Sequence, residues 1–433
     1  MRPPLSSICV VGGGQVALLA AAALARALPT ARVELVRTPR DPGAMADAAH
    51  GAFPALARLH KRIGIDEDAL IAGAAGTHRL ATAYKGWRRD GRTTIAGYPS
   101  ADAEGDFASA WIGAGSDRDA SAGPGAALAS AGRFARPATG PPLTGFGYAM
   151  RFSPAAHEAM LLRLCARLQV TVRDGAPADA DLIVDAGGMA PEGKRVDWSR
   201  FVPVDRVLID QGPPRLSPLD GMEALADGVR IHSPSRDATR TITCAAGGKG
   251  VAVASWRLEE AWRGNVVAIG DGAASLPPLG GAILQLAAAQ IELLLAHIPA
   301  REIEPLERRE YNRRAAMLAD NARDFVAAHF APASCPPGIF WEEAAKAERP
   351  ASLTHRIEDY VRRGRVPFHE EDIAGRAMWK ALLGALGYRG AASPRAAAMA
   401  PDRAAAMREA QRRRDAAAVA AALPYPEWIM RHR

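Results

Sequence analysis

Glycines near the start of the chain have the spacing of a phosphate-binding turn. Gly12, Gly14 and Ala17 form a G-x-G-x-x-A pattern between an apolar run and a long Ala/Leu stretch. Gly12 permits a tight turn, Gly14 lets the backbone approach a diphosphate, and Ala17 lets a helix pack closely on a sheet. The first N–H groups of that helix would face the phosphates, whose charge the helix dipole favours. We expect a dinucleotide-binding turn; the alternative is a glycine turn that only packs a helix on a sheet.

A second chemical signal lies far along the chain, in the segment NVVAIGD that ends at Asp271. An apolar strand pattern stops at Gly270-Asp271 and leads through prolines and glycines into a helix. In many FAD-dependent hydroxylases this arrangement places an Asp carboxylate on the ribityl hydroxyls. The next helix then points its N-terminus at the isoalloxazine ring, where negative charge builds on reduction. The alternative is that Asp271 only caps the turn. Together with the glycine turn, the segment predicts one shared FAD site.

The elements that position these residues predict an α/β fold. The pattern strand, glycine turn, helix and strand over residues 7–39 has the length of one βαβ unit. From Glu304 onward the sequence is mainly helical, with breaks at prolines. We predict an FAD-binding Rossmann-like module over residues 1–300, with inserted substrate-side strands, and a mainly helical substrate-side module over 301–433. Gly, Ala, Ser and Pro dominate residues 100–142, which predicts a long flexible loop.

Composition narrows the possible classes of protein. The 433 residues carry a net charge of +7, but the arginines are scattered through Ala-rich helical sequence with few aromatic residues between them. This pattern favours a solvated helix surface over nucleic-acid binding. The four cysteines lie far apart without a CxxC or Cys/His cluster, which predicts a reducing compartment and no metal site. Neither a signal peptide nor a membrane-spanning run is expected, so the predicted location is cytoplasmic.

Several segments resemble those of the flavin-dependent tryptophan halogenases. They are GGGQVALLAAAAL, THRLATAYKGW, VDWSRFVPVDR, RLEEAWRGNVVAIGDGAASLPPLGG, EYNRRAAMLADNARDFVAAHF and LPYPEWI, in family order across nearly the whole chain. The resemblance implies FAD that a separate flavin reductase supplies in reduced form. It also implies an aromatic, indole-like substrate, either a small molecule or borne on a peptide. In that family, reduced flavin and oxygen give a hydroperoxide that oxidises halide. A lysine then handles the hypohalous acid, and a glutamate helps the aromatic ring lose its proton.

The resemblance also shows where this sequence departs from the family. Arg79 stands at the position of the lysine, and an arginine cannot supply a free amine. Gly280 stands at the position of the glutamate, and Gly281 and Ala282 replace small hydroxylated residues beside the halide site. Residues 228–234 lack the W-x-W-x-I-P signature, and residues 43–48 replace a G-V-G-E-x-T loop. Arg37 occupies the end of the second strand, where an acid would hold a ribose hydroxyl.

Two functions follow from these patterns. The first is an FAD-dependent oxidoreductase that acts on an aromatic substrate as a halogenase using Arg79, as a monooxygenase or as an oxidase, although the usual lysine and glutamate of halogenation are absent. The second is a catalytically degenerate partner or scaffold with weak or no FAD binding, as a homodimer or as a heterodimer with a homologue. The predicted catalytic residue is Arg79, and the predicted cofactor contacts are Gly12, Gly13, Gly14, Gln15, Ala17, Arg37, Gly270, Asp271, Leu279, Gly280, Gly281 and Ala282.

Overall fold

The βαβ unit predicted from the glycine turn lies at the centre of a six-stranded sheet. The computed structural model describes residues 2–99, 123–177, 179–189, 193–392 and 394–432. The order of this sheet is β18-β19-β10-β1-β2-β9, and all neighbours pair in parallel except β18 with β19. Its strands are β1 (Ser7–Val11), β2 (Arg32–Arg37), β9 (Thr171–Asp174), β10 (Leu182–Asp185), β18 (Trp262–Arg263) and β19 (Val266–Ala268). The Rossmann-like prediction is confirmed.

Helix α1 (Gln15–Ala27) joins β1 to β2. Its alanines and leucines favour a helix, and Gly14 precedes it in an extended conformation. Ten of its residues are buried because α1 packs against α3 (Leu56–Ile63), α7 (Pro154–Arg167) and α8 (Ala282–Ala296). The side chains beside the glycine turn are therefore fixed by a continuous apolar core.

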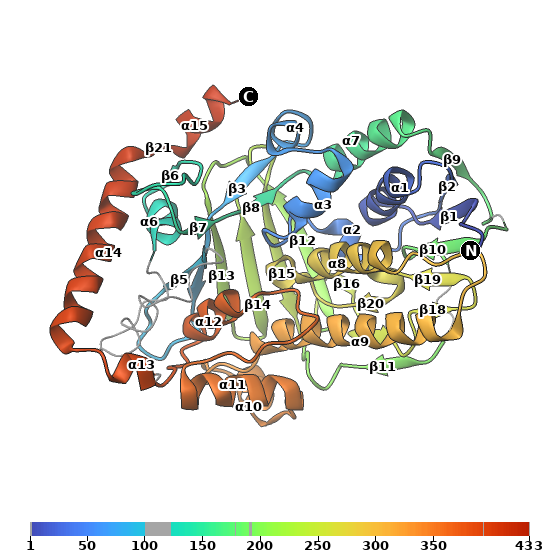
Figure 1. Cartoon of the computed structure of the whole chain (residues 1–433). Coiled ribbons are helices and arrows are strands. Elements are labelled where there is room, and N and C mark those ends of the chain that lie inside the picture. The colour runs from blue at the N-terminus through green and yellow to red at the C-terminus, as the bar shows by residue number, and fades with distance from the viewer. Residues whose placement is uncertain (1, 100–122, 178, 190–192, 393, 433) are drawn as a thin grey trace.

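A mainly antiparallel eight-stranded sheet forms the middle of the molecule (Figure 1), in the order β16-β12-β15-β14-β13-β4-β5-β7. These strands are β4 (Ala81–Lys85), β5 (Thr94–Pro99), β7 (Phe146–Gly147), β12 (Arg206–Gly212), β13 (Leu219–Leu225), β14 (Gly228–Ser233), β15 (Thr239–Ala245) and β16 (Val251–Ala252). The segment THRLATAYKGW is divided between β4 and β3 (Thr77–Arg79). Strand β3 instead pairs with β8 (Ala149–Arg151). Arg79 and Lys85 therefore lie on different strands, β3 and β4.

The C-terminal third is mainly helical, as predicted, but it is also joined to the sheet region. Its helices are α9 (Pro305–Ala328), α10 (Ile339–Lys346), α11 (Ala351–Arg363), α12 (Arg376–Ala385), α13 (Pro394–Ala397), α14 (Pro401–Ala421) and α15 (Tyr425–Arg431). Helix α9 packs on α8, and α14 runs along the edge of the molecule away from the glycine turn (Figure 1). Strand β21 (Leu423–Pro424) returns to pair with β6 (Arg133–Phe134).

The remaining elements are short. They are α2 (Met45–Ala48), α4 (Glu67–Gly73), α6 (Pro124–Ser130), β11 (Arg195–Asp197), β17 (Trp256–Leu258), β20 (Ala274–Ser275) and the 3₁₀ turns η1 (Gly270–Gly272) and η2 (Leu279–Gly281). The presence of α6 and β6 shows that the prediction of a loop over 100–142 is wrong for its second part. Buried Leu128 and Phe134 anchor that part in an apolar cluster. Residues 100–122 lie outside the described residues.

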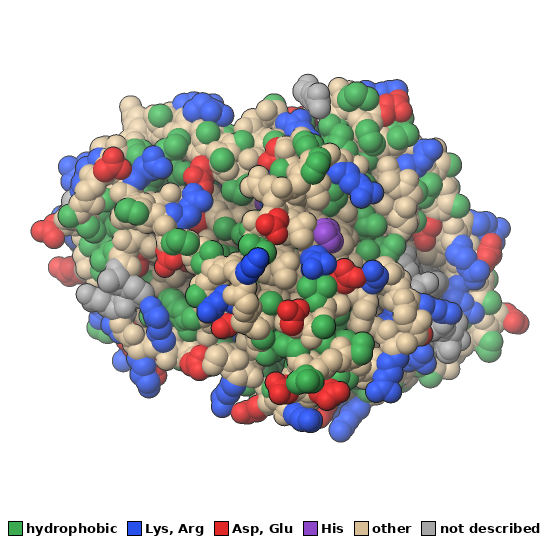
Figure 2. Space-filling view, turned by 180° about the vertical axis from the view of Figure 1, so that it is seen from behind, with side chains coloured by type: hydrophobic (Ala, Val, Ile, Leu, Met, Phe, Trp, Pro, Cys, Tyr) green, Lys and Arg blue, Asp and Glu red, His purple; other side chains and the backbone are tan. Residues whose placement is uncertain are grey.

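One buried helix and one charged face bear on whether the protein binds a membrane or a nucleic acid. By length and composition, Leu279–Ala296 would suffice to cross a membrane, but 67% of this stretch is buried inside the protein. Helix α8, which forms most of it, packs against α1, α3 and α9 as a core helix. Figure 2 shows basic and acidic side chains interspersed over one face of the molecule, so that face has no continuous basic surface.

Candidate functional site

The two segments predicted to share a cofactor lie next to each other. A Cβ added to Gly270 would lie 2.9 Å from Cγ1 of Val16, in the first turn of α1. The Asp271 carboxylate accepts hydrogen bonds from the backbone N–H of Ala46 (3.0 Å) and Asp47 (3.3 Å). The Asp47 carboxylate in turn accepts a hydrogen bond from the N–H of Val16 at 2.9 Å. Residues 46–47 therefore connect Asp271 to the start of α1.

The glycine turn is as tight as its sequence predicts. A Cβ on Gly12 would lie 2.8 Å from that of Ala17, and a Cβ on Gly13 would lie 2.2 Å from the carbonyl oxygen of Thr38. Larger side chains at either position would therefore displace backbone or a packed helix. Arg37, at the end of β2, is exposed. Among the described residues, the buried hydroxyl of Thr38 has no hydrogen-bond partner.

A small, partly open cavity of about 20 Å³, room for about one water molecule, lies at the N-terminus of α8. The cavity lies between the segment after α2, the eight-stranded sheet and the turn that precedes α8, and its lining residues are Ala48, Ala49, His50, Gly51, Arg79, Ile209, Ile231, Ser233, Ile242, Pro278, Gly280 and Gly281. Gly280 (φ 63°) and Gly281 (φ 86°) adopt left-handed conformations that favour glycine. Leu279 and Ala282 flank them and are fully buried. The Ser233 hydroxyl is buried without a partner among the described residues.

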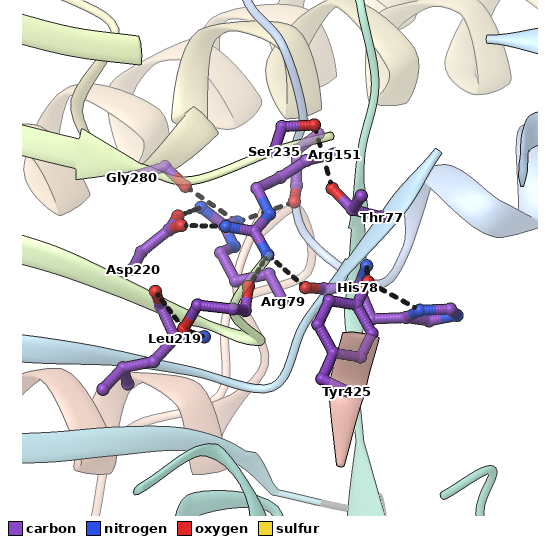
Figure 3. Close-up of polar contacts among 11 residues, drawn as sticks. Thr77, His78, Arg79, Arg151, Leu219, Asp220, Ser235, Gly280 and Tyr425 are labelled. Carbon is purple, nitrogen blue, oxygen red and sulfur yellow. Dashed lines mark hydrogen bonds and ion pairs between the residues drawn. The ribbon is translucent and has the colours of Figure 1, made fainter. Parts of the chain in front are cut away.

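Arg79 forms part of a buried cluster of charged side chains (Figure 3). Its Nη1 donates to Asp220 Oδ2 at 3.2 Å, and its Nη2 donates to the carbonyl oxygens of Ala52 (2.8 Å) and Gly280 (3.2 Å). Arg151 donates to the other carboxylate oxygen of Asp220 at 2.8 Å. All three charged residues are at most 5% exposed. The Arg79 guanidinium is therefore a fixed cation in the wall of the cavity, and it stays protonated.

The opposite side of Gly280 is filled by aromatic rings. A Cβ added to Gly280 would lie 3.4 Å from Phe325 and 4.0 Å from Phe53. The ring centroids of Phe53 and Phe325 are 5.0 Å apart, and that of Trp379 lies 5.4 Å from Phe325. Trp379 is fully buried. At the position where the resemblance places a glutamate, the chain therefore has a small residue against a packed hydrophobic core.

A hydrogen-bonded relay supports the segment between α2 and the cavity. The Gln15 amide nitrogen donates to the carbonyl oxygens of Ala46, Asp47 and Ala49. Its amide oxygen lies 2.8 Å from His157 Nδ1, and His157 Nε2 lies 3.1 Å from His60 Nε2. Burial lowers the pKa of His60 to about 4 and that of His157 well below its usual value, so both rings are neutral. This network assigns the Nδ1 proton to His157 and the Nε2 proton to His60.

The sequence matches the tryptophan halogenase family over residues 7–190 and 235–402. The chain belongs to this family. Among curated relatives, 7-chloro-L-tryptophan 6-halogenase KtzR of Kutzneria sp. (strain 744) is 32% identical over 102 residues, and tryptophan 6-halogenase SttH of Streptomyces toxytricini is 31% identical over 102 residues. Each match spans 24% of this chain and only 20% of the relative's length.

Solved structures extend the likeness to the whole fold. The flavin-dependent halogenase BrvH from Brevundimonas sp. BAL3 superposes with a TM-score of 0.87 at 21% identity, covering 99% of both chains. The SttH structure superposes with a TM-score of 0.86 at 20% identity, covering 100% of both chains. Flavin-dependent halogenases use FAD that a separate flavin reductase reduces, so family membership supports the predicted cofactor.

The residues of this chain fit FAD unevenly. At the ring end, the cavity meets the N-terminus of α8, and Gly280 and Gly281 leave no side chain there. The buried, unpaired Ser233 hydroxyl offers a polar contact in its wall. At the phosphate end, the glycine turn allows close approach of a ligand, but the Asp47 carboxylate already accepts the Val16 N–H. The cavity of about 20 Å³ is too small for an isoalloxazine ring, so the ring end fits only if its walls move apart. The phosphate end fits once the Asp47 carboxylate gives up its bond.

The structure brings the predicted glycine turn, Gln15, Gly270 and Asp271 together at the N-terminus of α1. It brings Arg79 and residues 279–282 together at the N-terminus of α8. Arg37 is exposed and follows Val36, whose carbonyl oxygen accepts the Gly12 N–H at 3.1 Å. Sequence reasoning missed Asp47, Asp220 and Arg151. The only signal for Asp47 was an acidic side chain in the loop 43–48. Asp220 and Arg151 had none, because each comes from a different strand and only the fold joins them to Arg79.

Proposed function

We propose that this chain binds FAD, receives it reduced from a separate reductase, and oxygenates an aromatic, indole-like substrate without halogen transfer. The observation that supports this most directly is the fixed Arg79 cation, which donates to the carbonyl oxygen of Gly280 just before the N-terminus of α8. A helix N-terminus and a fixed cation both stabilise the negative charge of a reduced ring. Bound FAD would supply the electrons and the activation of oxygen.

Arg79 and Gly280 do not supply the amine and the carboxylate that halogen transfer uses in this family. The Arg79 nitrogens donate to Asp220 and to the carbonyl oxygens of Ala52 and Gly280, so the side chain has neither a free amine nor freedom to turn. Gly280 carries no carboxylate that could take a proton from a substrate ring. Removal of a positioned acid or base normally lowers rates by factors of about 10² to 10⁴. In the proposed reaction, one oxygen atom enters the substrate and the other leaves as water.

The experiment that tests this proposal uses the full chain with FAD, NADH, a flavin reductase and indole, with and without bromide. We expect retained flavin absorbance and an oxygenated indole in the mass spectrum, at the same yield with and without bromide. A brominated product would contradict the loss of halogen transfer. A protein that neither retains FAD nor changes indole would contradict the enzymatic proposal altogether.

The second candidate function is a non-catalytic partner that keeps the fold. Two observations favour it: the Asp47 carboxylate on the first turn of α1, and the aromatic rings of Phe53 and Phe325 packed against Gly280. Both fill space beside the predicted site with the protein's own atoms. A colourless protein that ignores added FAD and forms a stable complex with an active homologue in size-exclusion chromatography would support this candidate.

A further inference from the structure

The N-terminus of α1 already holds an anion of the protein's own. The Asp47 side chain is only 3% exposed, and its Oδ1 accepts the Val16 N–H at 2.9 Å. A Cβ added to Gly14 would lie 2.2 Å from its carboxyl carbon, so the carboxylate lies directly against the backbone of the turn. This is the place where a Rossmann-like fold receives a diphosphate, because the N–H groups and the helix dipole attract negative charge there.

The carboxylate is held in place by its own segment. Gln15 binds the carbonyl oxygens of Ala46, Asp47 and Ala49, and the neutral His157 ring binds the amide oxygen of Gln15. From the other side, Asp271 accepts the N–H groups of Ala46 and Asp47. Asp47 therefore occupies the turn as part of a supported structure rather than as a mobile surface side chain.

Three charged side chains, from three different segments of the chain, act on Asp47 or are affected by it. Asp271 of η1 is a second carboxylate, and Arg40, after β2, forms an ion pair with Glu158 of α7. Of these, Arg40 favours the ionised form of Asp47, and Glu158 opposes it. Burial raises the pKa of Asp47 to about 6, and burial together with the Asp47 charge raises the pKa of Asp271 to about 7. Both carboxyl groups therefore hold a proton up to a higher pH than an exposed aspartate does.

We propose that Asp47 is an internal substitute for the FAD diphosphate, and that FAD binds only once this carboxylate takes up a proton and releases the Val16 N–H. The inference rests on the proposed function, because it takes FAD as the ligand. A diphosphate and an ionised Asp47 need the same N–H donors, and two anions at one helix N-terminus repel each other. Binding of FAD therefore takes up a proton, and FAD affinity rises as the pH falls.

The test is a titration of the full chain with oxidised FAD at pH 6, 7 and 8, followed by calorimetry and flavin fluorescence. For the unmodified protein we expect affinity to rise by up to about tenfold per pH unit from pH 8 to pH 7, in line with uptake of one proton. Asp47→Asn keeps an acceptor for Val16 but removes the charge. This variant is expected to bind FAD at least about tenfold more tightly at pH 8 and with a flat pH profile.

Two controls separate the charge at this turn from general effects. Asp66→Asn changes another helix-capping carboxylate, whose Oδ1 accepts the Ala69 N–H at 2.8 Å at the start of α4. It is expected to leave FAD affinity unchanged. Riboflavin has the ring without the phosphates, so its affinity is expected to be the same in the unmodified protein and in Asp47→Asn. If Asp47→Asn does not fold, Asp47→Ser offers a short uncharged cap for the same measurement.

The outcomes separate this inference from the proposed function. FAD binding that is independent of pH and equal in the unmodified protein and Asp47→Asn would overturn the inference while leaving the FAD-dependent function in place. Equal tightening of FAD and riboflavin would also overturn it, because the effect would then not involve the phosphates. Failure of every variant to bind FAD at any of the three pH values would overturn both.

Discussion

Two helix N-termini meet the candidate cofactor site, and they differ in what they hold. The N-terminus of α1 holds the carboxylate of Asp47, whereas the N-terminus of α8 opens through Gly280 and Gly281 onto a cavity with a fixed arginine in its wall. Both ends attract negative charge by the same physics. The N-terminus of α1 is therefore neutralised by a side chain of the protein itself, whereas the N-terminus of α8 faces a small cavity and the carbonyl-bound Arg79.

The buried charges near the N-terminus of α8 depend most strongly on Asp220. Asp220→Asn therefore has the largest expected effect on stability. The change leaves two buried guanidinium groups, Arg79 and Arg151, without a counter-charge. Loss of one member of a buried ion pair costs about 3 to 5 kcal/mol, so we expect the free energy of unfolding to fall by that amount. Urea unfolding followed by circular dichroism measures it.

The matched control is Glu223→Gln on the same strand, β13. Glu223 pairs with Lys85, whose side chain is 65% exposed, at 2.7 Å. An exposed pair of this kind contributes about 1 kcal/mol or less. If Asp220→Asn cost no more than this control, the cluster would not hold the α8 end together.

At the α1 end, Gly14→Val tests whether the turn receives phosphates. The new side chain would occupy the place of the Asp47 carboxylate, while the φ of −135° at Gly14 is open to any residue. We expect FAD affinity to fall by at least about 100-fold with an unchanged circular dichroism spectrum. Gly375→Ala is the control, since an added Cβ there meets no atom within 4 Å. Unchanged FAD affinity in Gly14→Val would show that the turn is only structural.

A smaller effect is expected from His157→Phe, which removes the ring that supports Gln15. The Gln15 amide oxygen and the His60 N–H lose their partner, which costs about 1 to 3 kcal/mol at pH 7.5. The pKa of His157 is lowered in the folded state, so its neutral ring stabilises the fold above its unfolded pKa of about 6.5. That contribution is lost as the pH falls.

The same variant is therefore expected to lose less stability than the unmodified protein between pH 7.5 and pH 5.5, as thermal unfolding at both values would show. His232→Phe is a suitable control, because His232 is exposed on β14. An equal acid sensitivity of His157→Phe and the unmodified protein would show that the relay does not carry this pH dependence.

Ser233→Ala has the smallest expected effect, and it tests whether the cavity at the N-terminus of α8 contacts a bound flavin ring. Its hydroxyl has no partner among the described residues, so stability is expected to stay within about 0.5 kcal/mol. If the hydroxyl contacts a bound ring, riboflavin affinity falls by a factor that corresponds to about 1 kcal/mol, the usual net value of one hydrogen bond. Fluorescence titration measures it, and unchanged riboflavin affinity would remove Ser233 from the site.

Sequence patterns alone predicted the parallel sheet around the glycine turn and the mainly helical end of the chain. These follow from local patterns, because glycine spacing and apolar periodicity act within one turn or strand. The sequence also placed Gly270 and Asp271 beside the turn, although only by resemblance to other flavoproteins.

Only the tertiary structure decided what those residues contact. The Arg79 guanidinium is fixed because β13 and β8 bring Asp220 and Arg151 to it, and Asp47 reaches α1 because Gln15, His157 and Asp271 hold its segment there. Such contacts join residues far apart in sequence, and their strength comes from burial, which no local pattern records. For this reason the sequence predicted a glycine turn that could receive a phosphate, and the fold placed the Asp47 carboxylate on the Val16 N–H of that turn.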